Sequence, residues 1–276
     1  MKKYLFFLAI LFLATSCNKD AKQAEGMLNE ARSYYEAHEY ATAKLFIDSL
    51  KKTYPKEPAI QRKGLQLMRE VDLAEQERNL SYCDSMLIVC LAKSDSLKKN
   101  FVFEKDPTYD DVGKFIAKKQ VLEKNLQKSY IRCNVNERGE MYLASVYYGA
   151  NPINHNQLKI TSPDGGFTET DIIPRDGGLN YTFKDMGTTT EVVSYMKGKD
   201  GGVIQFICDR QHDKLKAEYL GGKSYSFQMT AADKEAVAEI NELATVLSDI
   251  ERLKKEIQKA QSRIEYLKGK TNTDQE

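Results

Sequence analysis

Few side chains in this chain are suited to chemistry, because its 276 residues include only three histidines. His38 falls in a helical pattern and is expected at the surface. His212 lies within the charged stretch 209–213, which is more typical of a hairpin tip than of a metal site. No His-Glu-x-x-His or Gly-x-Ser-x-Gly motif occurs. We therefore assign no catalytic residue and no metal ligand, although two carboxylates distant in sequence could still act together.

The best candidate for an exposed binding edge lies around the third histidine. Tyr147 and Tyr148 precede a glycine and the loop Asn151–Asn156, which contains Asn154 and His155. A tyrosine ring suits such an edge because it offers both an apolar face and a hydroxyl group. Ordinary strand positions are the commoner explanation for tyrosines of this kind. If the chain binds a partner, these four residues are where we expect contact.

Two glycine-rich patterns are better explained as turns than as ligand loops. Asp164–Gly166 and two later Asp-Gly-Gly sequences lack the spacing of a calcium loop, and they supply the positive φ that hairpin turns need. Gly221–Ser224 ends like a phosphate-binding loop, but Ala217 stands where its first glycine is required. No helix is expected to follow it, so no helix N-terminus would face a phosphate. We predict no cofactor.

Four cysteines follow residue 17. Cys83 and Cys90 fall in one helical pattern, about 10 Å apart, which is too far for a disulfide. Cys133 and Cys208 lie in strand-like runs and could pair in an oxidising compartment. Two buried free thiols are the favoured alternative for this pair. No Cys-x-x-Cys occurs, so a zinc ribbon or redox motif is unsupported.

The composition excludes some functions. The 41 basic side chains balance 40 acidic ones, so the chain lacks the basic surplus of a nucleic-acid binder. The hydrophobic fraction of 41% is sufficient for a folded core. The length exceeds the commonest domain size of about 100–150 residues, which predicts two structural units.

The N-terminus indicates a location. Lys2 and Lys3 precede an apolar run of ten residues, which is too short to span a bilayer, and then Ala14-Thr15-Ser16-Cys17. This pattern resembles the signal of bacterial lipoproteins, although Ala14 stands where that family usually has leucine. The resemblance implies removal of residues 1–16 and acylation of Cys17, for example with palmitate. The alternative is an ordinary signal peptide with an incidental cysteine.

The resemblance also bears on sorting. Asn18 follows Cys17, and in lipoproteins of this kind that choice implies the outer membrane rather than retention at the inner membrane. Cys17–Asp20 is weakly similar to surface-export tags of Bacteroidetes lipoproteins. We therefore expect an outer-membrane protein that is held by lipid and faces either the periplasm or the cell surface.

Residues 17–57 are expected to hold the lipid anchor and a helical hairpin. The hairpin resembles one tetratricopeptide repeat, in which small residues let two helices approach and tyrosines fill the groove between them. An ordinary helical hairpin is the alternative. The positions that carry the resemblance are Ala31, Tyr34, Tyr35, Tyr40, Ala43, Leu50, Tyr54 and Pro55.

Two heptad seams bracket the middle of the chain. One lies in a long helix that begins at Pro58, and residues 58–128 should comprise this helix and a short one over 112–127. The other seam runs from Leu243 to Leu267 in a C-terminal helix within 230–270, which Thr230 and Asp233 cap. We favour antiparallel pairing of the two seams within one chain. The alternative is a homodimer through the Leu243–Leu267 seam.

Residues 129–229 show the pattern of β-strands, with short runs of alternating apolar and polar residues separated by turns. They predict an antiparallel β-sandwich or barrel inserted between the long helices, and residues 271–276 form a polar tail. The predicted class is therefore α+β. The function that fits is a non-catalytic binding or scaffold module with a protein or glycan partner. The alternatives are an envelope hydrolase with its site in the β domain, and a purely structural spacer.

Overall fold

The computed structural model describes residues 2–175 and 178–273, and the side chains of residues 19–175 and 178–270. The lipidation and sorting predictions rest on Cys17 and Asn18, whose side chains lie outside the described residues. The chain is 49% helical and 23% strand, with antiparallel sheets, which makes it an α+β protein as predicted. It divides into two compact units, residues 1–86 with 253–276 and residues 87–252.

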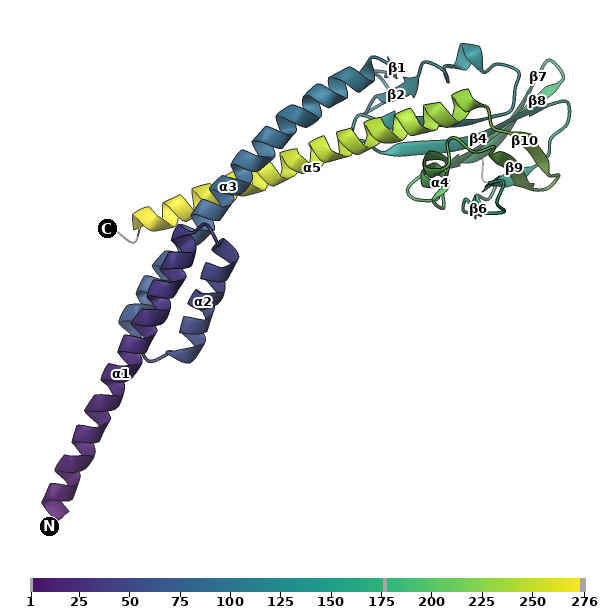
Figure 1. Ribbon diagram of the computed structural model, residues 1–276. Helices are drawn as coiled ribbons and strands as arrows, with labels where there is room; N and C mark the ends of the chain where they lie inside the picture. The colour runs from purple at the N-terminus through teal and green to yellow at the C-terminus, as the bar shows by residue number, and fades with distance from the viewer. Residues whose placement is uncertain (1, 176–177, 274–276) are drawn as a thin grey trace. The chain divides into compact units, whose positions relative to one another are not determined.

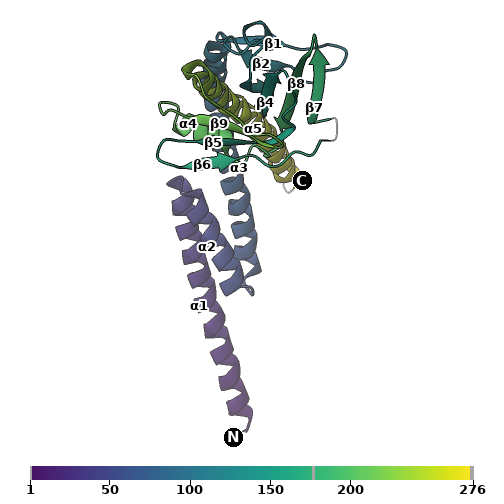
Figure 2. The same cartoon turned by 90° about the vertical axis from the view of Figure 1, so that its right-hand side faces the viewer.

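The first unit is helical (Figure 1). It contains α1 (Lys2–Glu36), α2 (Tyr40–Thr53), the first part of α3 (Pro58–Lys98) and the last part of α5 (Ala231–Thr273). Helices α1, α2 and the start of α3 lie side by side in both views (Figures 1 and 2). Ala31 and Ala43 are fully buried in their shared core, so small residues do allow close approach of these helices. The resemblance to a tetratricopeptide repeat stays a prediction.

Ion pairs join the helices of the first unit. Lys44 of α2 lies 2.6 Å from both Asp72 and Glu75 of α3. Arg263 of α5 lies 3.0 Å from the same Asp72. Asp72 of α3 therefore contacts both α2 and α5, and Glu75 adds a second contact between α3 and α2.

The second unit contains two open antiparallel sheets, with strand orders β1-β2-β3-β4-β8-β7 and β10-β9-β5-β6. Each order ends in edge strands, so the sheets do not form a closed barrel and that alternative of the sequence prediction is wrong. The strands are β1 (Phe101–Glu104), β2 (Lys114–Ala117), β3 (Tyr130–Asn136), β4 (Met141–Gly149), β5 (His155–Thr161), β6 (Phe167–Glu169), β7 (Asn180–Asp185), β8 (Thr188–Tyr195), β9 (Lys216–Gly221) and β10 (Tyr225–Gln228).

The core of the second unit combines both sheets with the first part of α5. Leu143 of β4, Ile160 of β5 and Ile240 of α5 are fully buried in it. The predicted cap of α5 is present, because Thr230 Oγ accepts the Asp233 backbone N–H at 3.1 Å. At the β3–β4 turn, Gly139 has φ +83°, and a Cβ there would lie 2.6 Å from the Ala244 carbonyl of α5. The turn therefore packs against the helix at a distance that only glycine permits.

The C-terminal seam is buried by the chain itself. Leu243, Val246 and Ile250 are at most 5% exposed in the second unit. In the first unit, Leu253 and Leu267 are both 3% exposed. A homodimer through this seam would have to displace contacts that each unit already makes.

Two predicted elements are wrong. The expected helix over 112–127 is instead β2 and a 3₁₀ turn, η1 (Leu122–Lys124). Strand β2 pairs with β3, and the buried Gln120 side chain fixes the following segment by bonding the Ile131 carbonyl and the Cys133 N–H. The sheet therefore begins at Phe101 rather than at residue 129.

The expected strand Val203–Cys208 is also wrong, because these residues lie in α4 (Val203–Asp209). Val203 and Ile207, four residues apart, are its fully buried positions, which is helical rather than strand spacing.

Among the residues that the structure describes, no helix combines the length and apolar character needed to span a membrane.

Candidate functional site

The structure assembles a polar network in the core of the second unit. His155 opens β5, Ser145 lies in the middle of β4, and Glu191 and Tyr195 belong to β8. His155 Nδ1 lies 2.8 Å from Glu191 Oε2, and its Nε2 lies 2.9 Å from Ser145 Oγ. Ser145 Oγ lies 3.0 Å from the Tyr195 hydroxyl. These four side chains form one hydrogen-bonded chain that links the two sheets.

A carboxylate, an imidazole and a serine in this order can activate a nucleophilic serine. Here, however, Ser145 and His155 are fully buried, and Glu191 and Tyr195 are only 1% exposed. Ser145 also lies within a strand that is paired on both sides, rather than on a sharp turn that would present its Oγ. The network therefore offers no access to a substrate and acts as a polar cross-link of the core.

Glu191 is the best satisfied member of this network. Its carboxylate also accepts the backbone N–H groups of Asn154, at 2.8 Å, and of His155, at 3.1 Å. Burial alone would raise the pKa of Glu191, but the hydrogen bonds from His155 and from both backbone N–H groups outweigh it, so that the pKa lies below its ordinary value. Burial raises the pKa of Tyr195 to about 12, which keeps its hydroxyl protonated. The Tyr219 ring stacks on His155 at 4.8 Å between ring centroids.

The four residues of the predicted binding edge do not lie on one exposed edge. Tyr147 is buried on the inner face of the six-stranded sheet, where its hydroxyl donates to the Asn151 carbonyl, and His155 is buried at the start of β5 in the four-stranded sheet. Asn154 accepts a hydrogen bond from Arg175 in the adjoining loop. Tyr148 faces the opposite side, because successive residues of a strand alternate between the two faces. The prediction of a shared exposed edge is therefore wrong for Tyr147 and His155.

The opposite side of the six-stranded sheet, which we call the outer face, carries two hollows. The strand register aligns its side chains in rows, since Arg132 lies opposite Ala144, which lies opposite Ser194. The next row contains Val146, Val192 and Tyr181. The outer face consists of Tyr130, Arg132 and Asn134 of β3, Tyr142, Ala144, Val146 and Tyr148 of β4, Thr190, Val192 and Ser194 of β8, and Tyr181 and Phe183 of β7.

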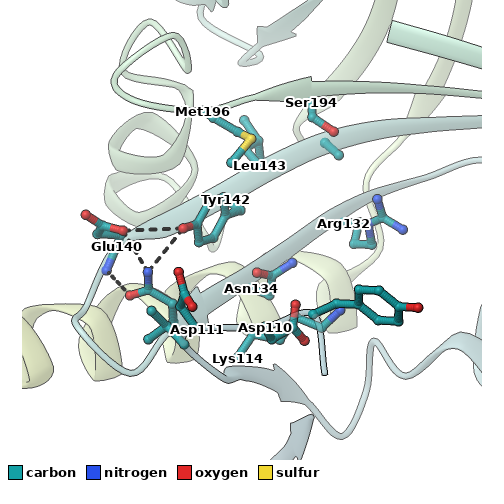
Figure 3. A pocket seen from close by; sticks show the side chains of 14 residues that line it. Asp110, Asp111, Lys114, Arg132, Asn134, Glu140, Tyr142, Leu143, Ser194 and Met196 are labelled. Atoms are coloured by element: carbon teal, nitrogen blue, oxygen red, sulfur yellow. Dashed lines mark hydrogen bonds between the residues drawn. The ribbon is translucent and has the colours of Figure 1, made fainter. Parts of the chain in front are cut away.

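The first hollow, of about 410 Å³, is mainly polar. Figure 3 shows Arg132 and Asn134 of β3, Tyr142 of β4 and Ser194 of β8 around it, with Asp110 and Asp111 contributed by the β1–β2 loop. Its rim is held by hydrogen bonds at the β3–β4 turn, where Asn136 Nδ2 lies 2.7 Å from Glu140 Oε2 and 3.1 Å from the Tyr142 hydroxyl.

The second hollow, of about 340 Å³, is mainly aromatic and apolar. Tyr148, Tyr181 and Phe183 line it, together with Leu126 and Met186 from two loops. Tyr181 and Phe183 have nearly parallel rings, with an interplanar angle of 18° and centroids 6.4 Å apart. Phe183 is 50% exposed and Met186 is 98% exposed, so these apolar side chains of the hollow are open to solvent.

Arg132 lines both hollows. It is half-buried, and among the described residues it forms no ion pair with a carboxylate. Its guanidinium group interacts with the Tyr130 hydroxyl; burial raises the pKa of that hydroxyl, and Arg132 opposes the rise. The outer face therefore offers an arginine available to an anion, hydrogen-bonding side chains and exposed aromatic rings.

Cys133 and Cys208 add no site. Cys133 and Cys208 are free thiols in the structure, which corresponds to the alternative without a disulfide. Burial raises the pKa of Cys133 well above its ordinary value and that of Cys208 to about 11. Within the described residues, no cluster of histidine, cysteine and acidic side chains could hold a metal ion.

Comparison of the chain with protein-family models, with curated proteins and with solved structures gives no significant match.

The outer face was missed by the sequence reasoning. Alternation in Tyr130–Asn134 and Tyr142–Tyr148 does identify side chains that share a face. The neighbouring strands β8 and β7, which complete the surface, follow about forty residues later, and their register cannot be read from the sequence.

Proposed function

We propose that this chain is a non-catalytic binding module of the bacterial cell envelope, held at the outer membrane by lipid on Cys17. Its ligand surface is the outer face of the six-stranded sheet. The observation that carries this proposal is the pair of hollows joined at Arg132, with exposed aromatic rings at one end and polar side chains at the other. Exposed aromatic side chains are typical of recognition surfaces, as is an arginine that, like Arg132 among the described residues, has no carboxylate partner.

The binding role is favoured over the hydrolase alternative by access. Ser145 with His155 and Glu191 is an arrangement that could activate a nucleophile, but it is buried. The outer face is open, but its tyrosines, amides and Arg132 do not form a nucleophile paired with a base. A fluorophosphonate probe that labels activated serines should leave Ser145 unmodified. Labelling that is lost in Ser145→Ala but kept in Ser224→Ala would favour the hydrolase.

The binding role can be tested on arrays of cell-wall glycans and envelope-protein peptides, with the full chain in detergent. The double variant Tyr181→Ala/Phe183→Ala should weaken binding at least about tenfold, because it removes the exposed rings of the second hollow. Phe167→Ala is the matched control, since Phe167 is 58% exposed but lies on β6 of the other sheet. Equal loss in both variants would contradict the proposal. Absence of any bound ligand would favour the structural spacer.

The proposed location rests on the sequence around Cys17. Cells fed with labelled palmitate should incorporate it into the wild-type chain and not into a Cys17→Ala variant. Failure to label the wild type would refute the lipoprotein proposal. Protease treatment of intact cells then distinguishes a surface orientation, in which the chain is degraded, from a periplasmic one.

We also propose that the two sheets pack as an antiparallel sandwich and that the helical seams pair within one chain as in a coiled coil. The shared core cluster, to which both sheets contribute, supports the sandwich. The burial of Leu243, Ile250 and Leu267 within a single chain supports the intramolecular seam over the homodimer. Light scattering in detergent, with the detergent mass subtracted, should give a monomer, and a stable dimer would favour pairing between chains.

A further inference from the structure

The strongest unexplained feature of the outer face is the position of Arg132. Two other arginines of the second unit have anionic partners, Arg210 in Asp164 at 2.8 Å and Arg252 in Asp249 at 2.7 Å. Arg132 is half-buried on β3 and has no carboxylate partner among the described residues. Partial removal of a guanidinium group from water is unfavourable, and an anion that reaches it gains correspondingly more from a charge-assisted hydrogen bond.

The sheet leaves room for an anion beside Arg132. In the register of β3, β4 and β8, Arg132 lies in one row with Ala144 and Ser194. The side chains of Ala144 and Ser194 in this row are small, so they project little from the sheet. The larger Tyr142 and Val146 occupy the flanking positions of β4. Arg132 lines both hollows and Ala144 and Ser194 line the first, so Arg132 lies at the boundary of the two hollows, in one row with a serine hydroxyl.

The aromatic side chains of the second hollow suit a sugar ring. Tyr181 and Phe183 are 37% and 50% exposed and have nearly parallel rings. A pyranose presents a flat face of C–H groups to such rings, and its hydroxyl groups need partners such as Thr190, Asn134 and the Tyr142 hydroxyl. An acyl chain would leave these polar side chains unsatisfied. A peptide added as a strand would use a sheet edge rather than a sheet face.

The charges of the second hollow select among sugars. Arg132 and Lys128 line it against the single acid Asp185, so its formal balance is 2 − 1 = +1. The first hollow has Lys114 and Arg132 against three acids, a balance of 2 − 3 = −1, so an anion is expected on the side of Arg132 that faces the second hollow. We propose that the outer face binds a saccharide bearing a carboxylate, with the carboxylate on Arg132 and a sugar ring against Tyr181 and Phe183. This inference rests on the proposed binding function and specifies its ligand class.

The test uses calorimetric titration of the full chain in detergent with three acidic probes: oligogalacturonate, a hyaluronan oligosaccharide and N-acetylmuramic acid. The matched neutral ligand for each is its methyl ester. At least one acidic probe should bind about tenfold more tightly than its ester, as expected for a charge-assisted pair. Raised salt should reduce this preference, because the site is open to solvent.

Arg132→Gln should abolish the preference for the acid while leaving binding of the ester unchanged. Arg138→Gln is the matched control, since Arg138 is exposed at the β3–β4 turn and lines neither hollow. Melting curves of both variants establish that they remain folded. Equal affinity for acid and ester, or a preference that survives Arg132→Gln, would overturn the proposal.

The two proposals can fail separately. If neutral sugars or peptides bind and Tyr181→Ala/Phe183→Ala abolishes that binding, the binding function stands and the acidic saccharide is wrong. If none of the three acidic probes binds, the acidic saccharide is likewise wrong. If in addition no ligand of any class binds, both proposals are wrong.

Discussion

His155 Nδ1 lies 2.8 Å from Glu191 Oε2 in the core of the second unit, and neither side chain is more than 1% exposed. This pair links the four-stranded sheet to the six-stranded sheet, because His155 opens β5 and Glu191 belongs to β8. Since Glu191 also accepts two backbone N–H groups, the carboxylate fixes the entry of the chain into β5. A buried acid that accepts several hydrogen bonds fixes the local structure, and its removal leaves donors unsatisfied.

Glu191→Gln should destabilise the second unit by about 1–3 kcal/mol for each donor left unpaired, because an amide N–H₂ cannot accept the hydrogen bonds that the carboxylate accepts. Denaturant unfolding measures this loss. Glu169→Gln is the control. Glu169 lies on the partly exposed β6 and forms an ion pair with Lys159 of β5, so its substitution should change stability by less than about 1 kcal/mol. Equal effects of both substitutions would contradict the structural role of Glu191.

The same carboxylate predicts a dependence on pH. The pKa of Glu191 is lower in the folded chain than its ordinary value of 4.5, so the ionised form is favoured by folding. Its contribution to stability is therefore complete above about pH 4.5 and is lost as the pH falls through the lower, folded-state pKa. Unfolding free energies measured between pH 7 and pH 3 should fall less steeply in Glu191→Gln than in the wild type. Parallel curves would contradict the assignment.

Thr189→Val should stabilise the second unit. The Thr189 side chain is fully buried, and its hydroxyl has no hydrogen-bond partner among the residues that the structure describes. Valine has nearly the same shape without the polar atom, so the substitution removes a desolvation cost of about 1–3 kcal/mol. The melting temperature should rise by a few degrees, whereas Thr190→Val on the opposite face should change it little. A lower melting temperature for Thr189→Val would show that the hydroxyl has a partner.

Met186→Asn should also be stabilising. Met186 and Gly187 form the two-residue β7–β8 turn with φ +46° and +83°, a conformation that asparagine adopts far more readily than methionine. The expected gain is about 1 kcal/mol, and Met186→Leu, which keeps the apolar character, should show no gain. If Met186→Asn raises the melting temperature but weakens binding at the second hollow, methionine is retained there for recognition. A loss of stability would contradict the strain argument.

Long-period signals made the helices predictable from the sequence. Helix α3 begins at Pro58, and α5 begins beside the Thr230–Asp233 cap, as predicted, because their seams repeat over many turns. The helix predicted over residues 112–127 was wrong because Phe115 and Leu122 fit a helical face as well as a strand. What decides the outcome is the long-range bonding of Gln120 to β3, which no local pattern encodes.

The site was less predictable than the fold because it depends on strand register. Ser145 and Glu191 lie on the same face of neighbouring strands because β4 pairs with β8. The register places Tyr147, two residues after Ser145, opposite Glu191. Likewise, Arg132 and Ser194 share one row only through the pairing of β4 with both β3 and β8. A shift of either strand by one residue would exchange the inner and outer faces, and the sequence does not specify the register directly.

The thiols of Cys133 and Cys208 give the last prediction. Both lie in or against the same core, and burial raises the pKa of each, so neither is a thiolate at neutral pH. In the native chain at pH 8, a disulfide reagent such as dithionitrobenzoate should react with neither at an appreciable rate, and both should react after guanidinium unfolding. Cys133→Ala and Cys208→Ala should each lower the denatured count by one without changing the native count. The contrary result is a wild-type chain that loses two mass units on exposure to an oxidant and regains them on reduction. If neither single variant loses them, a Cys133–Cys208 disulfide is established instead.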